Sequence, residues 1–294
     1  MKKISIILAA LIFCGIAYAD ETVTAPGAEV IKLADGFGFT EGPTADSTGD
    51  VYFVDDPKCR IHRWSVADGK VSVFAEDTQH ANGMYFDKND ILYACEGGSG
   101  SIVSYDRDAK RTVVADKFEG KRFNKPNDLW IAPNGGIYFT DPVYGAEFSV
   151  VQDGEHVYYI SPDRSEIKKV VNDMIRPNGL IGTPDGKLLY ITDEPARKVW
   201  RYAIAEDGSL TDKTLFAEVG VDGMMLDCRG NVYITVDRIY VYSPDGREIQ
   251  QILVPEWPAN LCFGGPERKT LYITARTGFY SIEMCVTGAS GEEK

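Results

Sequence analysis

The sequence predicts an all-β protein, a six-bladed β-propeller, on three observations. A strand motif centred on a tyrosine occurs six times along the chain. Each copy is rich in β-branched and aromatic residues and follows a group of turn residues, which is typical of strands in hairpins. No stretch after residue 19 keeps a helical hydrophobic period. Repeats of about 40 to 50 residues are typical of the four-stranded blades of propellers.

The six copies are evenly spaced and plainly related. Successive tyrosines lie 39 to 52 residues apart. A second hairpin follows the motif, for example IHRWSVADGKVSVFA after the first copy and SIVSYDRDAKRTVVA after the second, so each unit is predicted to hold four strands. We expect the tyrosines to pack within and between blades. The copies are GDVYFVD, DILYACE, GGIYFTD, KLLYITD, GNVYITV and KTLYITA, with Tyr52, Tyr93, Tyr138, Tyr190, Tyr233 and Tyr272 at their centres.

The two ends of the chain complete the predicted ring. The sixth unit stops after GFYSIEMCV, which leaves it one strand short. The segment AEVIKLAD, residues 28–35, resembles the fourth strand of the other units. We therefore predict that the last blade is closed by an N-terminal strand, because closure removes the unpaired edges of an open array. Residues 20–294 are predicted to form this single domain.

The first 19 residues predict a signal peptide. They contain two lysines, a short apolar run and an Ala-Tyr-Ala exit before Asp20. The run is short for a membrane span, and no later stretch is apolar enough to cross a bilayer. We expect cleavage after Ala19 and export to a periplasm or the cell exterior, with no membrane contact afterwards. A retained anchor is the alternative.

Charge, cysteines and missing motifs narrow the classes of function. The net charge of −13 disfavours nucleic acid and anionic membranes as partners, and nothing implies a protein partner. Five cysteines follow the leader without a CxxC pair; export permits a disulfide, but the spacing does not assign one. No GxSxG, HExxH or phosphate-loop motif occurs, so serine-hydrolase, zincin and nucleotide-binding hypotheses lack support.

One position of the repeat carries a side-chain oxygen in all six units. It lies eleven or twelve residues before each tyrosine, where the outer strand of one blade leads into the innermost strand of the next. In a propeller this place is one mouth of the central channel. The six residues are Glu41, Asn82, Asn127, Asn178, Asp222 and Asn260.

This ring of oxygens indicates a metal site. Carboxylates and carboxamides without His or Cys are hard ligands that suit Ca²⁺ or a similar divalent cation. Two carboxylates on one axis repel each other, and a cation between them removes the conflict. A single Asn or Asp before Gly is also an ordinary turn former, but six at one register favour the metal. The case for metal binding is weakest for Asn82 and Asn260. Hydrogen bonds to neighbouring loops would also explain these two residues.

At these residues the chain closely resembles the SMP-30/gluconolactonase/LRE-like family, also called regucalcin-like. The specific segments are FTEGP, RFNKPNDL, YFTDPVYG, RPNGL and VDGM, and the likeness covers nearly all of the chain after the leader. The resemblance implies a six-bladed propeller that hydrolyses sugar lactones with one divalent cation at the channel mouth, commonly Ca²⁺, with Zn²⁺ or Mn²⁺ as alternatives. It implies metal ligands at Glu41, Asn178 and Asp222, with Asn127 as a fourth ligand or a substrate contact.

The implied reaction is the opening of a small-molecule lactone by water. The cation serves as Lewis acid and lowers the pKa of the attacking water. By resemblance Asp222 is the catalytic general base, and direct attack by Asp222 on the substrate is the alternative.

Five residues are predicted to contact the substrate at this mouth, namely His80, Asn82, Arg122, Asn127 and Asp128. Asp128 follows Asn127, and Arg122 begins the same loop. His80 lies two residues before Asn82. Three of them also have structural explanations, because Asp128 suits a turn, Arg122 a solvated loop and His80 the surface.

Acidic residues also end several of the tyrosine strands, and we expect hydrogen bonds between blades rather than catalysis from them. These residues are Asp55, Glu96, Asp141 and Asp193.

Two other functions fit the same sequence. One is a phosphotriesterase on the same metal site, and the other is a non-catalytic propeller that binds a protein or glycan. A pure scaffold does not need two carboxylates on its axis, which argues against the second. A wide polar mouth favours sugar lactones and a tight apolar one favours organophosphates; Asn82, Asp128 and Arg122 favour the sugar lactone. The long loop 143–158 is predicted to act as a lid.

Overall fold

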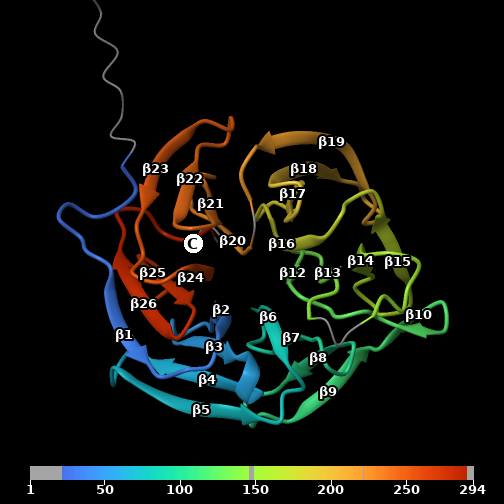
Figure 1. Ribbon diagram of the computed structural model, residues 1–294, viewed down its shortest axis with the longest axis horizontal. Coiled ribbons are helices and arrows are strands. Elements are labelled where there is room, and N and C mark those ends of the chain that lie inside the picture. Colours follow the sequence, from blue (N-terminus) through green and yellow to red (C-terminus); the bar gives the residue numbers. More distant parts are fainter. Residues whose placement is uncertain (1–21, 146–148, 221, 290–294) are drawn as a thin grey trace, which may run out of the picture.

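The computed structural model describes residues 22–145, 149–220 and 222–289. Over these ranges the chain forms six four-stranded antiparallel sheets arranged in a ring around a central axis, with no α-helix and one turn of 3-10 helix at Asp56–Lys58 (Figure 1). The predicted all-β, six-bladed propeller is therefore confirmed. No helix long and apolar enough to span a membrane occurs in the described part of the chain. The predicted signal peptide, residues 1–19, lies outside the described residues.

Each of blades 1 to 5 is built from four strands that follow one another in the chain, with the first strand innermost and the fourth outermost. Antiparallel neighbours joined by short turns are what the hairpin signals predict. The strands of blades 1 to 3 are β2 (Thr40–Ala45), β3 (Val51–Asp55), β4 (Arg60–Ser65) and β5 (Lys70–Glu76); β6 (Ala81–Phe86), β7 (Leu92–Glu96), β8 (Ser101–Tyr105) and β9 (Arg111–Ala115); β12 (Leu129–Ile131), β13 (Ile137–Asp141), β14 (His156–Ile160) and β15 (Ile167–Val171). Those of blades 4 and 5 are β16 (Pro177–Gly182), β17 (Leu188–Asp193), β18 (Lys198–Ile204) and β19 (Leu210–Ala217); β20 (Met224–Leu226), β21 (Val232–Thr235), β22 (Ile239–Tyr242) and β23 (Glu248–Ile252). A separate two-stranded sheet between blades 2 and 3 is formed by β10 (Lys117–Phe118) and β11 (Lys121–Arg122).

Blade 6 is closed by the N-terminal segment, as predicted. Three of its strands come from the C-terminal part of the chain, namely β24 (Pro258–Gly264), β25 (Thr270–Ala275) and β26 (Gly278–Glu283). The fourth is β1 (Ile31–Asp35), which pairs antiparallel with β26 (Figure 1). Val23, ahead of β1, is fully buried, and its main-chain N–H donates to the side-chain oxygen of Gln250 in blade 5 at 2.9 Å. The closure therefore extends beyond the paired strand.

Most repeat tyrosines are buried within the blades, which confirms their packing role. The exposed fraction of Tyr138 and of Tyr233 is 0%. The Tyr138 hydroxyl donates to the carbonyl of Gly208 in blade 4 at 2.8 Å, so it also joins two blades. Tyr93 is less buried and stacks under the guanidinium of Arg164 from blade 3, 5.7 Å from its ring centre.

In three of four cases the acid that ends the second strand binds the segment that leads in from the preceding blade, rather than a strand of another blade. Asp141 accepts the main-chain N–H groups of Asn124 and Lys125, which lie in the connection from blade 2 to blade 3. Asp193 and Asp55 bind the connections into their own blades in the same way.

The prediction is wrong for Glu96. Its carboxylate binds Tyr105 and Arg111 of its own blade instead, because both side chains project from the neighbouring strands β8 and β9.

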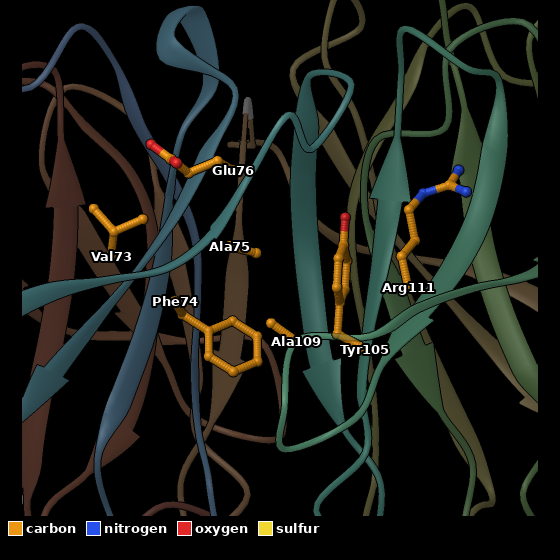
Figure 2. Close-up of a pocket in the computed structure, with 7 residues that line it drawn as sticks. All are labelled: Val73, Phe74, Ala75, Glu76, Tyr105, Ala109 and Arg111. Carbon is orange, nitrogen blue, oxygen red and sulfur yellow. The ribbon is translucent and has the colours of Figure 1, made fainter.

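A groove lies on the outside of the ring between the outer parts of blades 1 and 2 (Figure 2). The rings of Phe74 and Tyr105 approach each other across it in an edge-on arrangement, with centroids 6.4 Å apart. It is formed by strands far from the channel axis, so it is separate from the predicted site. All five cysteines in the described residues are free, so no disulfide joins this part of the chain.

Candidate active site

The predicted ring residues lie where the innermost strands begin, at one mouth of the channel. Glu41 is the second residue of β2 and Asn178 the second of β16, whereas Asn127 and Asp222 lie just before β12 and β20. The side chains of Glu41, Asn127 and Asn178 belong to buried residues, and Asp222 is partly buried. Four blades thus each contribute one of these residues.

Glycines explain how these strands come so close. A Cβ atom built on Gly179 would lie within 3.0 Å of the main-chain oxygen of Asp222 in the next blade. A Cβ atom on Gly223 would likewise overlap the side-chain amide of Asn260. The recurrent pairs Asn-Gly and Asp-Gly therefore reflect close approach of neighbouring blades as well as turn formation.

Hydrogen bonds connect three of the four proposed ligands. The Asn127 amide nitrogen donates to Asn178 Oδ1 at 2.7 Å. A hydrogen bond from Asn178 lowers the pKa of Asp222, which places these side chains in contact as well. The site is therefore contiguous across blades 3, 4 and 5.

The two carboxylates form an electrostatic conflict. Burial raises the pKa of Glu41 well above its usual range, and the charge of Asp222 raises it further. Burial also raises the pKa of Asp222, followed by the charges of Asp128 and Glu194. A divalent cation bound by oxygen ligands fits this donor set, because it would compensate both charges.

The four candidate metal ligands do not form a cluster of acidic residues, because only two of them are acids. In residues 22–145, 149–220 and 222–289 no three His, Cys, Asp or Glu side chains cluster in a way that could hold a metal ion. The candidate site instead combines two carboxylates, Glu41 and Asp222, with two carboxamides, Asn127 and Asn178. The roles of these four as ligands stay predictions.

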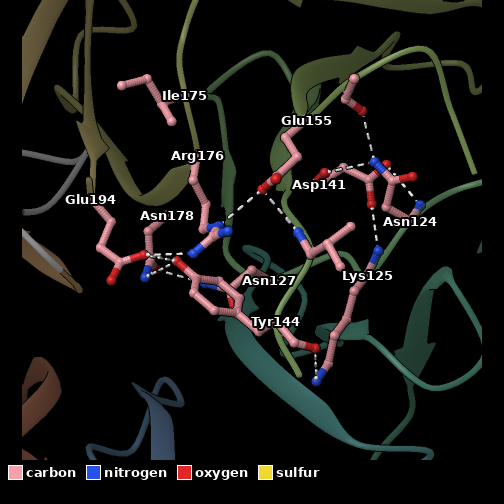
Figure 3. A network of polar contacts seen from close by, with 12 residues as sticks. Asn124, Lys125, Asn127, Asp141, Tyr144, Glu155, Ile175, Arg176, Asn178 and Glu194 are labelled. Carbon is pink, nitrogen blue, oxygen red and sulfur yellow. Dashed lines mark hydrogen bonds and ion pairs between the residues drawn. The ribbon is translucent and has the colours of Figure 1, made fainter. Parts of the chain in front are cut away.

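A polar network that sequence reasoning missed surrounds Asn178 (Figure 3). The Asn178 amide nitrogen donates to the hydroxyl of Tyr144 at 2.9 Å, and that hydroxyl donates to Glu194 at 3.1 Å. Arg176 reaches Glu155 at 3.2 Å and Glu194 at 3.6 Å. The available signal was the segments YFTDPVYG and RPNGL, which contain Tyr144 and Arg176.

Asp128 is buried, unlike a turn residue at the surface. Its two oxygens accept the main-chain N–H groups of Leu129 and, across the blade boundary, Leu180. Burial raises the pKa of Asp128 to about 7, and hydrogen bonds that include one from Asn260 act against that rise. Asp128 thus links blades 3, 4 and 6, and its contact with substrate stays a prediction.

The other predicted substrate contacts are engaged with the protein. The Arg122 guanidinium donates to the carbonyls of Phe123 and Asn124 in its own loop. The His80 ring nitrogen lies 3.3 Å from a carboxylate oxygen of Asp56. Asn82 is partly buried, with its main chain next to blade 1. The structure therefore assigns structural contacts to these residues, and their substrate roles stay predictions.

The predicted lid, loop 143–158, is anchored at several points. Tyr144 near its start contacts Asn178, as described above. Further along, the main-chain N–H groups of Val151 and Gln152 donate to the Asn124 side chain at 2.7 and 3.0 Å. Residues 146–148 lie outside the described residues.

Comparison with known proteins places this chain in a family. The model of the SMP-30/Gluconolactonase/LRE-like region matches residues 39–277. The gluconolactonase of Zymomonas mobilis is 30% identical over 277 residues, which cover 83% of this chain and 78% of that protein. The X-ray structure of a family-assigned gluconolactonase has a TM-score of 0.85 at 34% identity, covering 91% of this chain and 96% of that one. A gluconolactonase from Xanthomonas campestris has a TM-score of 0.83 at 28% identity, with 89% and 91% covered. This chain therefore belongs to the SMP-30/gluconolactonase/LRE-like family.

Proposed function

We propose that this protein is a lactonase that opens sugar lactones and depends on a divalent cation held by Glu41, Asn127, Asn178 and Asp222. The observation that carries the proposal is the juxtaposition of two carboxylates from blades 1 and 5 with two carboxamides from blades 3 and 4. The relatives named gluconolactonases support lactone hydrolysis by this chain. The donor set supports Ca²⁺ as the first choice, with Zn²⁺ and Mn²⁺ as alternatives.

Each residue of the site has a separate role in opening the lactone ring. When bound, a divalent cation supplies Lewis-acid stabilisation of the carbonyl oxygen and lowers the pKa of a water. The Asp222 carboxylate accepts the proton of the attacking water and so acts as general base. Asn127 and Asn178 hold each other in place through their 2.7 Å hydrogen bond. This pre-organisation limits the loss of freedom on substrate binding.

The rim of the site supports a sugar substrate over an organophosphate. A chain of polar and charged side chains extends from Asn178 through Tyr144 to Glu194, Arg176 and Glu155. Hydroxyl groups of a sugar lactone match such donors and acceptors, whereas an apolar triester does not. A small-molecule lactone is therefore the proposed substrate class.

The test is acid release from glucono-δ-lactone, followed at constant pH above the uncatalysed rate. The chelator-treated protein should be inactive, and added Ca²⁺, Mn²⁺ or Zn²⁺ should restore turnover. Asp222→Asn should lower the rate of lactone opening at least about 100-fold, as expected for loss of a general base. Asp245→Asn is the matched control, because Asp245 is an exposed acid of the same blade in the turn between β22 and β23.

Other results would redirect the proposal. Full activity after chelation would contradict the metal-dependent mechanism. Cation binding without turnover of sugar lactones, but with turnover of a phosphotriester, would establish the alternative hydrolase. Binding without any turnover would favour a non-catalytic propeller.

We also propose that residues 1–19 direct export to the periplasm or the cell exterior. The support is the pattern of two lysines, an apolar run and an Ala-Tyr-Ala exit. Mass spectrometry of the exported protein should find a chain that begins at Asp20. A cytoplasmic chain that still begins at Met1 would contradict this.

A further inference from the structure

We propose that Tyr144 is a positioning residue that sets which way the Asn178 amide faces, with its nitrogen at Tyr144 and its oxygen at Asn127. The inference rests on the proposed function, because that oxygen is one of the proposed cation ligands. Tyr144 lies between β13 and β14 of blade 3, and Asn178 belongs to β16 of blade 4. Figure 3 shows the Tyr144 hydroxyl next to both Asn178 and Glu194.

The direction of each hydrogen bond follows from the groups involved. The Glu194 carboxylate only accepts, so the single hydroxyl proton of Tyr144 is donated to it, at 3.1 Å. The hydroxyl then has only lone pairs left for Asn178. It therefore accepts from the Asn178 amide nitrogen, at 2.9 Å.

The direction of the Asn178 side-chain oxygen follows from these hydrogen bonds. With its nitrogen bound to Tyr144 and to the Asp222 carboxylate, Asn178 directs Oδ1 the opposite way, where it accepts from the Asn127 amide nitrogen at 2.7 Å. A reversed amide would place oxygen against oxygen at Tyr144 and nitrogen against nitrogen at Asn127. Two hydrogen bonds would be lost in a buried place, since the exposed fraction of Asn178 is 6%.

Tyr144 is itself held in position from several sides. Its ring lies under the Arg176 guanidinium, 5.2 Å from the ring centre, and Arg176 also reaches Glu194. Its main-chain oxygen accepts from Lys125 Nζ at 3.3 Å. The preceding N–H, of Val143, donates to Glu155 at 3.0 Å. The hydroxyl is thus a fixed acceptor, as expected of a group that orients a ligand.

The first test observes the Asn178 amide directly in the metal-free protein. In a sample labelled with ¹⁵N-asparagine, the Asn178 side-chain NH₂ signals are assigned by their loss in Asn178→Asp. Tyr144→Phe should shift and broaden these signals, because the amide nitrogen loses one of the two acceptors that fix its orientation, while the ring under the Arg176 guanidinium is kept. Tyr158→Phe is the matched control, since the buried Tyr158 hydroxyl has no hydrogen-bond partner among the described residues. Unchanged Asn178 signals in Tyr144→Phe would overturn the proposal, whatever the protein binds.

The second test asks whether the orientation matters for a cation. Calorimetry with Ca²⁺ should show about tenfold weaker binding in Tyr144→Phe, as is typical when a residue that orients a ligand is lost. In an Asn178→Asp background the same change should alter affinity by less than about twofold, because a carboxylate has two equivalent oxygens and no orientation to select. Equal losses in both backgrounds would indicate a packing role and overturn the proposal. A wild-type protein that binds no cation would refute the proposed function instead, while the first test would still decide the role of Tyr144.

Discussion

Gly42, which follows the ring residue Glu41, lies directly against the main-chain carbonyl of Asn82, the ring residue of the neighbouring blade. A Cβ atom at Gly42 would come within 3.0 Å of that oxygen, and the φ of Gly42 is +46°. The innermost strands of blades 1 and 2 can therefore converge only if residue 42 lacks a side chain. The same relationship holds between Gly179 and Asp222.

This contact predicts a large penalty for Gly42→Ala. The positive φ costs about 1 kcal/mol and overlap with a backbone that cannot move aside costs about 1–3 kcal/mol more in the free energy of unfolding. Gly36→Ala is the control, because Gly36 also has a positive φ of +86° but no atom within 4 Å of the added Cβ. Urea denaturation should show about 1 kcal/mol for Gly36→Ala and clearly more for Gly42→Ala. Equal losses would show that the strands do not converge as described.

The ion pair of blade 2 between the buried Glu96 and the more exposed Arg111 predicts a second difference. Glu96 is fully buried and binds Arg111 through both oxygens, at 2.8 and 2.6 Å. Glu96→Gln should lower the free energy of unfolding by about 3 kcal/mol, since it removes the charge of a fully buried carboxylate that binds both Arg111 and Tyr105. Glu76→Gln should change it by less than about 1 kcal/mol, because Glu76 and its partner Arg60 are exposed. One member of each pair, Glu76 and Arg111, lines the groove of Figure 2, so similar losses would contradict the difference in burial of the two carboxylates.

The closure of blade 6 predicts that the N-terminal segment is part of the folding unit. Val23→Asp should cost at least about 3 kcal/mol in the free energy of unfolding, because it introduces a charge into a fully buried position. Ile31→Asp, in β1 but with an exposed fraction of 59%, should cost less than about 1 kcal/mol. Thermal unfolding of both variants checks this. Native-like stability of Val23→Asp would show that the segment is dispensable.

Asp141 predicts a dependence of stability on pH. Burial raises its pKa to about 7, against about 3.9 in the unfolded chain, so the folded state binds more protons between these values. Its contribution to stability therefore falls as pH rises from about 4 to about 7 and is constant above that. Between pH 8 and pH 5 the wild type should gain about 2–3 kcal/mol from this group, a gain that Asp141→Asn lacks.

The comparison is made by urea denaturation in the presence of a chelator, so that cation binding does not contribute. Asp163→Asn serves as control, because hydrogen bonds from Ser161 and Ser165 lower the pKa of Asp163 to about 2, outside this range. Its pH dependence should match that of the wild type. If Asp141→Asn also matched the wild type, the carboxylate of Asp141 would be ionised throughout.

Much of the fold could be predicted because its signals are local and repeated. The six copies of the tyrosine motif predicted six blades. The sixth unit lacks one strand, which predicted that the N-terminal segment closes the ring, and β1 does pair with β26. The register of the ring position also located the mouth of the channel. Glu96 shows the limit of this reasoning. It occupies the same repeat position as Asp141, yet it binds its own blade because Tyr105 and Arg111 happen to reach it.

The network around Asn178 could not be predicted for a related reason. Tyr144, Arg176 and Glu194 come from three different connections, and only the packing of blade 3 against blade 4 brings them together. No periodicity marks them, since each occurs once rather than in every repeat. The RPNGL and YFTDPVYG segments identified their neighbourhood without indicating which side chains touch.

The sequence by itself determined the blade count, the closure of the ring and the place where polar side chains gather, because strand period and repeat length depend on residues close together in the chain. The tertiary structure alone decided which of the six ring residues contact one another. It pairs Asn127 with Asn178 and turns Asn260 toward Asp128. These contacts join residues of different blades, so they depend on how the blades pack around the channel and on which donors and acceptors burial leaves unsatisfied.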